Sequence, residues 1–225
     1  MALTQMDWAK QHSNHATELA SRMTKIILIR HGHVEGIVPE RFRGRQDLSL
    51  TDTGRKQAMA AARRIQASWK AVAVYSSPLS RCLETAGKIA DSLGLKVETT
   101  PELVDINYGE WQGLTPKQAQ ARWPEAIKRW RDEPHLADIP GGESLAEVTA
   151  RASRAFLQIV ARHNKEAVVI VSHDSVNRLL MLWALGLPLS AFRRLRQDPC
   201  AINELDFVQG YAQLATMNET DHLRR

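Results

Sequence analysis

Two arginines and two histidines stand just beyond predicted strands, where side chains of these types can bind an anion. Each follows an aliphatic run: residues 25–29 precede Arg30 and His31, residues 71–75 lead through Ser-Ser-Pro to Arg81, and residues 167–172 precede His173. Ligands of parallel α/β sheets bind beyond the carboxyl ends of the strands, so we expect these side chains to meet at one edge. A guanidinium group can donate two parallel hydrogen bonds to two oxygens of one phosphate. That edge is therefore predicted to bind a phosphate dianion.

A histidine in such a site can attack phosphorus when its attacking nitrogen carries no proton. His31 is the candidate, because Gly32 after it lets the chain turn and lets a ligand approach the backbone. A carboxylic acid must then protonate the leaving oxygen. The loop that follows residues 97–99 offers three candidates for this role, which are Glu102, Asp105 and Glu110.

The elements that must position these residues alternate between strands and helices. Strands are predicted at residues 25–29, 71–75, 97–99, 167–172, 202–207 and 211–216. Helical segments are predicted in five places. The first begins at Thr51 or Asp52, the second ends at Leu93, and the third covers residues 115–132. The fourth ends at His163 and the fifth at Leu185. Asp174 is expected to cap the last of these helices, because Asp is a strong N-cap residue. This alternation predicts a single α/β domain, a three-layer α/β/α sandwich.

The composition is that of an ordinary globular chain. Its 225 residues are 44% hydrophobic and carry a net charge of +5, without the concentrated basic stripe of a nucleic-acid-binding protein. Cys82 and Cys200 are too few for a disulfide framework. The longest apolar run, residues 179–187, is too short to span a membrane, and residues 1–22 contain no apolar signal-peptide segment. We therefore expect a cytoplasmic protein that binds neither membranes nor nucleic acid.

Six ordered motifs carry a resemblance to a known family. They are Arg30-His31-Gly32, the stretch from Phe42 to Gly54, the stretch from Ser76 to Ala86, the stretch from Asp105 to Gly113, residues 140–144, and Val171-Ser172-His173. Together they resemble the histidine phosphatase superfamily, in its phosphatase branch. The resemblance implies a phosphoglycerate mutase-like fold with a mostly parallel central sheet. It also implies that residues 23–225 form the histidine phosphatase domain, with 107–140 as a lid or insertion segment, after an N-terminal extension at 1–22.

The resemblance implies a role for each matching residue. His31 would be the nucleophile that forms a phosphohistidine, and Asp105 would be the acid and base. The groups that hold the phosphoryl oxygens would be Arg30, Arg81 and His173. Substrate contacts are expected from four further residues, which are Arg43, Gly44, Tyr108 and Asp174. No metal or other cofactor is expected, because arginines neutralise the charge of the phosphoryl group.

Four positions depart from the family pattern, and one of them is Asp174, which stands where Gly is common. Asp105 stands where Glu is usual, and its side chain is one methylene shorter. Ile37 replaces an Asn that is frequent in the mutases and would remove one phosphate donor. His33 stands where Glu, Gln or Thr is usual; it is expected to be structural or to lie at the rim, with auxiliary acid as the other interpretation.

The sequence leaves several functions open. The leading prediction is a metal-independent phosphomonoesterase for a small phosphorylated metabolite: a sugar phosphate, a phosphoglycerate or a cofactor precursor. The alternatives are a phosphoglycerate mutase-type transferase and a non-catalytic module that binds a phosphate ligand. A metallohydrolase using His31, His33, His173 and Asp174 is less favoured, because two arginines at the same edge would repel a cation. Whether the chain forms a homodimer is also left open.

Overall fold

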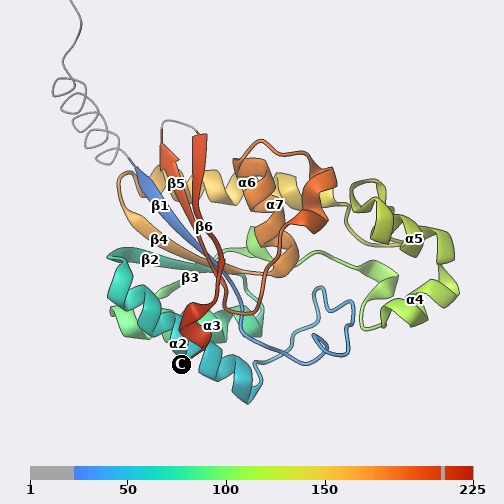
Figure 1. Cartoon of the computed structure of the whole chain (residues 1–225), viewed down its shortest axis with the longest axis horizontal. Coiled ribbons are helices and arrows are strands. Elements are labelled where there is room, and N and C mark those ends of the chain that lie inside the picture. The colour runs from blue at the N-terminus through green and yellow to red at the C-terminus, as the bar shows by residue number, and fades with distance from the viewer. Residues whose placement is uncertain (1–22, 209–210, 225) are drawn as a thin grey trace, which may run out of the picture.

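A six-stranded sheet organises the fold, which a computed structural model describes for residues 23–208 and 211–224. Its strands are β1 (Thr24–Arg30), β2 (Ala71–Ser76), β3 (Val97–Thr99), β4 (Ala167–Ser172), β5 (Ile202–Val208) and β6 (Tyr211–Glu219). They lie in the order β3-β2-β4-β1-β5-β6 (Figure 1). The first four strands in this order are parallel to one another. β5 pairs with β1 in the antiparallel direction, and β6 pairs with β5 in the antiparallel direction. The carboxyl ends of β1, β2 and β4 therefore meet at one edge of the sheet, as predicted.

Helices cover both faces of the sheet. The helices are α2 (Asp52–Ser68), α3 (Ser80–Leu93), α4 (Pro116–Arg122), α5 (Pro124–Asp132), α6 (Leu145–Arg162) and α7 (Asp174–Ala184). The apolar core on one face joins β1 to α2 and α3, and the core on the other face joins it to α6 and α7. The predicted three-layer α/β sandwich with a mostly parallel sheet is confirmed.

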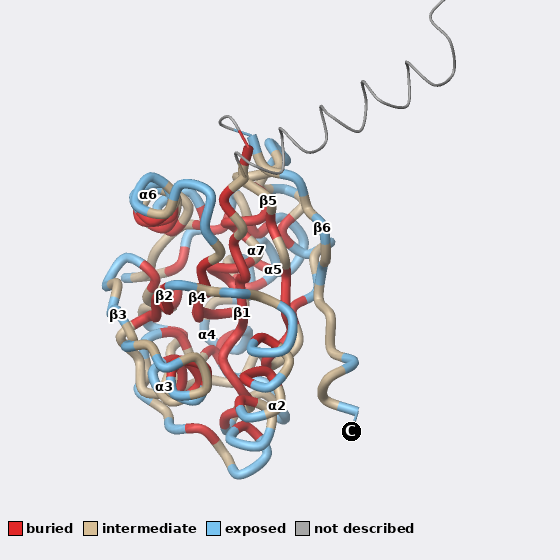
Figure 2. The backbone as a smooth tube through the Cα atoms, turned by 90° about the vertical axis from the view of Figure 1, so that its left-hand side faces the viewer, coloured by how far each residue is buried: buried red, intermediate tan, exposed pale blue. Residues whose placement is uncertain are grey.

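The alternation of side chains along β1 explains why it lies at the centre. Ile27 and Ile29 belong to the core with α2 and α3, whereas Ile26 and Leu28 belong to the core with α6 and α7. All four side chains are fully buried. Figure 2 shows β1 as a mostly red, buried segment of the backbone. Burial of each contributes roughly 1.5–3 kcal/mol of hydrophobic stabilisation. The strand is therefore a rigid base for the residues that follow it.

The predicted helix boundaries agree closely with the structure, with one exception. Thr51 caps α2 by accepting a hydrogen bond from the Gly54 backbone, and Gly94 ends α3 in the left-handed conformation. The prediction that Asp174 caps α7 is wrong. The N-cap is His173, which stays extended at the end of β4, and Asp174 is the first helical residue. Its carboxylate instead pairs with Arg178, one turn further along α7, at 2.9 Å.

The segment between η1 (Pro101–Leu103) and α6 contains α4, α5 and two short turns, η2 (Gly109–Trp111) and η3 (Pro134–Leu136). In Figure 1, α4 and α5 lie beside the sheet rather than over it. Trp130 of α5 is buried against the rings of Tyr108, Trp111 and Phe192. The tryptophan therefore packs into the protein, and the lid role predicted for residues 107–140 stays a prediction. The predicted extension at 1–22 lies outside the described residues.

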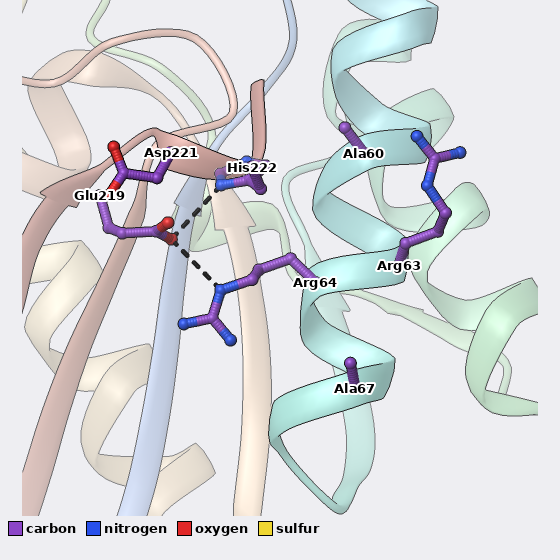
Figure 3. Close-up of a pocket in the computed structure, with 7 residues that line it drawn as sticks. All are labelled: Ala60, Arg63, Arg64, Ala67, Glu219, Asp221 and His222. Atoms are coloured by element: carbon purple, nitrogen blue, oxygen red, sulfur yellow. Dashed lines mark ion pairs between the residues drawn. The ribbon is translucent and has the colours of Figure 1, made fainter. Parts of the chain in front are cut away.

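The C-terminal segment returns to α2. Leu223 of η5 (Asp221–Leu223) packs on the small cluster that contains Val34 and Cys200. The next residue back, His222, donates from Nε2 to the Cys200 carbonyl at 3.1 Å. A hollow of about 340 Å³ lies here. In Figure 3, Glu219 faces both His222 and Arg64 of α2. This hollow shares no lining residue with the pocket that contains His31.

Candidate active site

His31 lies where β1 leaves the sheet. Its backbone N–H donates to the Ser172 carbonyl at 3.0 Å, which ties the ends of β1 and β4 together. Its Nδ1 lies 2.7 Å from the Gly32 carbonyl, to which it can only donate. Its Nε2 lies 3.2 Å from Nε of Arg81, a group that can only donate to it. These two partners assign the proton to Nδ1 and leave Nε2 unprotonated, with its electron pair accepting the Arg81 N–H.

The loop that carries His31 packs directly on the start of α2. A Cβ atom on Gly32 would lie 2.6 Å from the Gly54 carbonyl oxygen, so only glycine fits this contact. The Gly32 backbone also donates to the Thr85 hydroxyl of α3 at 3.1 Å. Both helices on this face therefore fix the position of the imidazole.

Arg81 is fully buried and occupies the centre of the site. Its two Nη atoms donate to the carbonyls of Gln46 and Gly44, each at 2.7 Å. Nη2 also donates to Oδ2 of Asp105 at 3.2 Å. Gly44 has a φ of +47°, and a Cβ atom there would lie 2.9 Å from the Ile106 carbonyl oxygen. Glycine at this position thus allows the loop to bring its carbonyl to the guanidinium.

Asp105 points into the site from the loop after η1. Its Oδ1 accepts a hydrogen bond from the Ile106 backbone at 2.9 Å. Its Oδ2 lies 3.7 Å from Nδ1 of His173, beyond hydrogen-bond distance. Arg151 of α6 holds the loop by donating to the carbonyls of Val104 and Asp105 at 2.6 and 3.1 Å. Arg151 therefore fixes the loop backbone from which the Asp105 side chain reaches Arg81.

His173 is fully buried behind Asp105. Its Nε2 lies 2.7 Å from the Ser77 hydroxyl and 3.5 Å from the sulfur of Cys82. Its ring centroid is 5.3 Å from that of His31. Burial, Arg81 and His31 together hold the pKa of His173 well below its ordinary value. The imidazole is therefore neutral at neutral pH.

The electrostatics of the other two groups suit a nucleophile and an acid. Burial lowers the pKa of His31 well below its ordinary value, and the charges of Arg81 and Arg30 lower it further. Burial raises the pKa of the Asp105 carboxyl, although Arg81 acts in the opposite direction. His31 is thus held without a proton on Nε2, and Asp105 retains its proton to higher pH than an exposed aspartate.

Arg30 is held from the other side of β1. Its Nη1 donates to the Gln197 carbonyl at 2.5 Å. The Gln197 side chain in turn exchanges two hydrogen bonds with the Asn203 amide, each at 2.8 Å. The Nε of Arg30 is buried and has no hydrogen-bond partner among the described residues. The guanidinium is therefore oriented by the protein while its buried Nε–H stays available as a donor.

A pocket of about 120 Å³ opens above these groups. Six of the candidate residues line it, which are His31, Arg43, Gly44, Asp105, Tyr108 and Asp174. The other three, Arg30, Arg81 and His173, are buried behind its surface. Of the alternative acids, Glu102 and Glu110 are exposed to solvent, so only Asp105 enters the pocket.

The remaining candidates from the sequence lie elsewhere. His33 contacts the Thr51 hydroxyl at 3.0 Å and does not line the pocket. Ile37 packs on the cluster with Val34. Within the described ranges, no group of three or more His, Cys, Asp or Glu residues is arranged to hold a metal ion. No helix there has the length and apolar character needed to cross a membrane.

Several residues around the pocket were not predicted from the sequence to belong to the site. Ser77 and Cys82 contact His173 from segments about 90 residues away. Arg178 and Arg193 also line the pocket. The spacing of Asp174 and Arg178 by one helical turn is a signal that could have indicated their pairing. No local pattern marks Arg193.

The comparisons with known proteins agree with this geometry. The profile of the histidine phosphatase superfamily (branch 1) matches residues 26–220. Phosphoserine phosphatase 1 of Hydrogenobacter thermophilus is 33% identical over 201 residues, which cover 89% of this chain and 95% of that protein. Three mycobacterial relatives at 32% identity are longer, and the chain spans 55% of their length.

Two solved structures share the fold over most of the chain. YhfR of Bacillus stearothermophilus has a TM-score of 0.84 at 30% identity, covering 89% of this chain and 99% of that chain. The mycobacterial glucosyl-3-phosphoglycerate phosphatase has a TM-score of 0.81 at 29% identity, covering 88% and 100%. The chain therefore belongs to the histidine phosphatase superfamily and is a phosphoric monoester hydrolase.

Proposed function

We propose that this protein hydrolyses a small phosphorylated metabolite through a phosphohistidine on His31, without a metal ion. The observation that carries the proposal is that Nε2 of His31 has no proton, which the hydrogen bonds with the Gly32 carbonyl and Arg81 assign. The names of two relatives, a phosphoserine phosphatase and a glucosyl-3-phosphoglycerate phosphatase, support a small phosphate ester as substrate. The small volume of the pocket supports the same class, because sites for drug-sized ligands occupy about 300–1,000 Å³.

In the first step, Nε2 of His31 forms a bond to phosphorus and the bond from phosphorus to the ester oxygen breaks. The leaving oxygen takes the electron pair and receives the proton of Asp105. Arg30, Arg81 and His173 would stabilise the charge on the three phosphoryl oxygens during the transfer. Because these groups are fixed by backbone carbonyls and by Ser77, they need little rearrangement to do so.

In the second step, a water molecule attacks phosphorus and gives its proton to the Asp105 carboxylate. The bond from phosphorus to Nε2 breaks, and its electron pair returns to the imidazole. Inorganic phosphate leaves, and the site is restored. The two steps replace one difficult displacement by two easier ones.

The test uses a radiolabelled aryl phosphate, quenched in alkali so that a phosphohistidine survives. We expect the label on the peptide that contains His31, and we expect His31→Ala to lose both the label and nearly all turnover. The matched control is His33→Gln, which replaces an imidazole that contacts Thr51 rather than the pocket. Label on another residue, or turnover that survives in His31→Ala, would refute the mechanism.

The same assay separates the alternatives. Transfer of the label to an added phosphoglycerate faster than to water would show a mutase-type transferase. Absence of turnover on every ester, including the aryl phosphate, would show a non-catalytic binding module. Activity lost to a chelator and restored by a divalent cation would contradict metal independence.

The cytoplasmic location, the absence of membrane or nucleic-acid partners and the question of a homodimer stay predictions.

A further inference from the structure

Glu143 joins three segments of the chain just outside the pocket. Its Oε1 lies 3.0 Å from Arg45, in the loop between β1 and α2. Its two oxygens accept from Nε and Nη2 of Arg151 of α6, each at 3.0 Å. Its Oε2 also accepts from the Asn107 backbone, in the loop that carries the acid, at 2.8 Å. None of these four residues lines the pocket that contains His31, so their contacts act on its frame.

Arg151 connects the Glu143 carboxylate to the backbone on which Asp105 stands. Its Nη1 donates to the carbonyls of Glu102 and Val104, each at 2.6 Å, and its Nη2 donates to the Asp105 carbonyl at 3.1 Å. The paired hydrogen bonds to Glu143 fix the plane of the guanidinium, because a planar fork matches a carboxylate in one orientation. That orientation aims the remaining donors at the three carbonyls.

The contacts form a closed ring around the acid. Arg45 follows Gly44, whose carbonyl accepts from Arg81 at 2.7 Å. Arg81 in turn donates to the Asp105 carboxylate at 3.2 Å. The ring therefore passes from Asp105 through Arg81 and the loop to Glu143, and returns through Arg151. Glu143 is the member of this ring that lies furthest from the phosphoryl-binding groups and still ties both of its halves together.

The negative charge of Glu143 matters as much as its shape. Arg45 and Arg151 both contact Oε1 at 3.0 Å, so two guanidinium groups share one oxygen. Burial acts to raise the pKa of Glu143, but the hydrogen bonds from Arg151 and the Asn107 backbone, with the charge of Arg45, hold it below its ordinary value. The carboxylate therefore stays ionised at neutral pH and screens the two positive groups from each other.

We propose that Glu143 is a positioning residue for the general acid, which acts by orienting Arg151 on the backbone of Asp105. The inference rests on the proposed function, in which Asp105 protonates the leaving oxygen. Without the carboxylate, Arg151 loses the partner that fixes its plane, and the acid loop is free to shift. A displacement of about 1 Å of a catalytic group can cost about 10²-fold in rate.

The first test is Glu143→Gln, which keeps the size of the side chain. Its amide nitrogen donates rather than accepts, so it must face one of the groups that now donate to the carboxylate. We expect kcat for an alkyl ester, glycerol 3-phosphate, to fall about 10- to 100-fold with little change in KM. Turnover of an aryl phosphate should change little, because its leaving group needs little protonation. A general loss of structure would lower both activities alike.

A second variant separates the fork of Arg151 from its charge. Arg151→Lys keeps the positive charge but cannot donate to the carboxylate and to three carbonyls at once. It should show the same selective loss on the alkyl ester. The matched control is Glu147→Gln, in which the altered carboxylate is exposed and accepts from Ser144 at the start of α6. The control should leave the ratio of alkyl to aryl turnover unchanged, and urea unfolding of each variant reports its stability.

A double variant shows whether Glu143 acts through the acid. Asp105→Asn alone should show the selective loss, and Glu143→Gln added to it should lower alkyl turnover no further. The effects of residues that act as a unit do not multiply, whereas the effects of independent residues do.

Each result decides one of the two assignments. Equal losses on the two esters in Glu143→Gln and Arg151→Lys would overturn the positioning role, and so would unchanged alkyl turnover in both. Losses that multiply in the double variant would overturn it too. If Glu143→Gln does not fold, Arg151→Lys decides by the same criterion. A selective loss in Asp105→Asn, absent from the other two variants, would remove the positioning role and keep the acid. Asp105→Asn without a selective loss would refute the acid, and the positioning role with it.

Discussion

Replacement of Asp105 by Asn tests the assignment of the acid most directly. The amide has nearly the shape of the carboxyl group, and its single oxygen can accept from either the Ile106 backbone or Arg81. The substitution thus removes the transferable proton with little change of structure. A positioned general acid contributes about 10²- to 10⁴-fold to the rate. We expect a loss of this size in kcat for an alkyl phosphate, whose leaving oxygen is strongly basic.

The loss should depend on the leaving group. An aryl oxide needs little protonation, so Asp105→Asn should retain most of its turnover of an aryl phosphate. The substitution also removes a negative charge 3.2 Å from Arg81, so inorganic phosphate should inhibit the variant more strongly than the wild type at pH 8. The dependence of activity on pH tests the same assignment. Activity of the wild type on alkyl esters should decline as pH rises through the raised pKa of Asp105, and this decline should be absent from the variant.

The assay is phosphate release from one alkyl and one aryl ester over a range of pH, with inhibition by phosphate measured in parallel. Glu110→Gln is the matched control, because this carboxylate comes from the same loop but is exposed. Equal losses on the two esters in Asp105→Asn would refute the assignment, and so would weaker inhibition by phosphate. A loss in Glu110→Gln that follows the leaving group would transfer the role to that residue.

Three further predictions concern the frame of the site. Gly44→Ala should lower the free energy of unfolding by about 1–3 kcal/mol, measured in denaturant, because its positive φ and the Ile106 carbonyl leave no room for a Cβ atom. Asn203→Leu should raise KM for every ester, because Gln197 then loses the amide that fixes the carbonyl on Arg30; an unchanged KM would show that Arg30 needs no such support. Unfolding at a series of pH values should show stability falling below about pH 6.5, since unfolding lets His31 and His173 regain ordinary pKa values and take up protons. Asp105, whose pKa is raised, acts in the opposite direction, so a stability that rises on acidification would mean that it outweighs the histidines.

Local patterns were sufficient to predict the sheet and the edge where His31, Arg81 and His173 meet. The strands that precede these residues can be recognised from their aliphatic runs, because a strand buried on both faces needs an apolar residue at nearly every position. The placement of Asp105 beside them depended on the family resemblance, since nothing in its own loop distinguishes it from Glu102. In the structure, Asp105 is buried and Glu102 is exposed to solvent. This difference depends on how the whole loop packs and not on the type of either residue.

The parts that could not be predicted depend on contacts between distant segments. Asp174 has the type of an N-cap residue, but the chain leaves β4 extended through His173 and so shifts the start of α7. Arg193 reaches the pocket only because Trp130 of α5 offers a carbonyl and a ring to hold it. Such pairings are set by how the layers pack, and a sequence pattern within either segment does not contain them.

The sulfur beneath His173 has a consequence for how the enzyme withstands oxidants. Cys82 is fully buried, and burial raises the pKa of its thiol to about 12. Only a thiolate reacts readily with peroxide or alkylating agents, so this sulfur is chemically inert despite lying 3.5 Å from an imidazole. If nitrogen of His31 is the attacking atom, as proposed, dephosphorylation should continue under oxidative stress that inactivates a cysteine-dependent phosphatase.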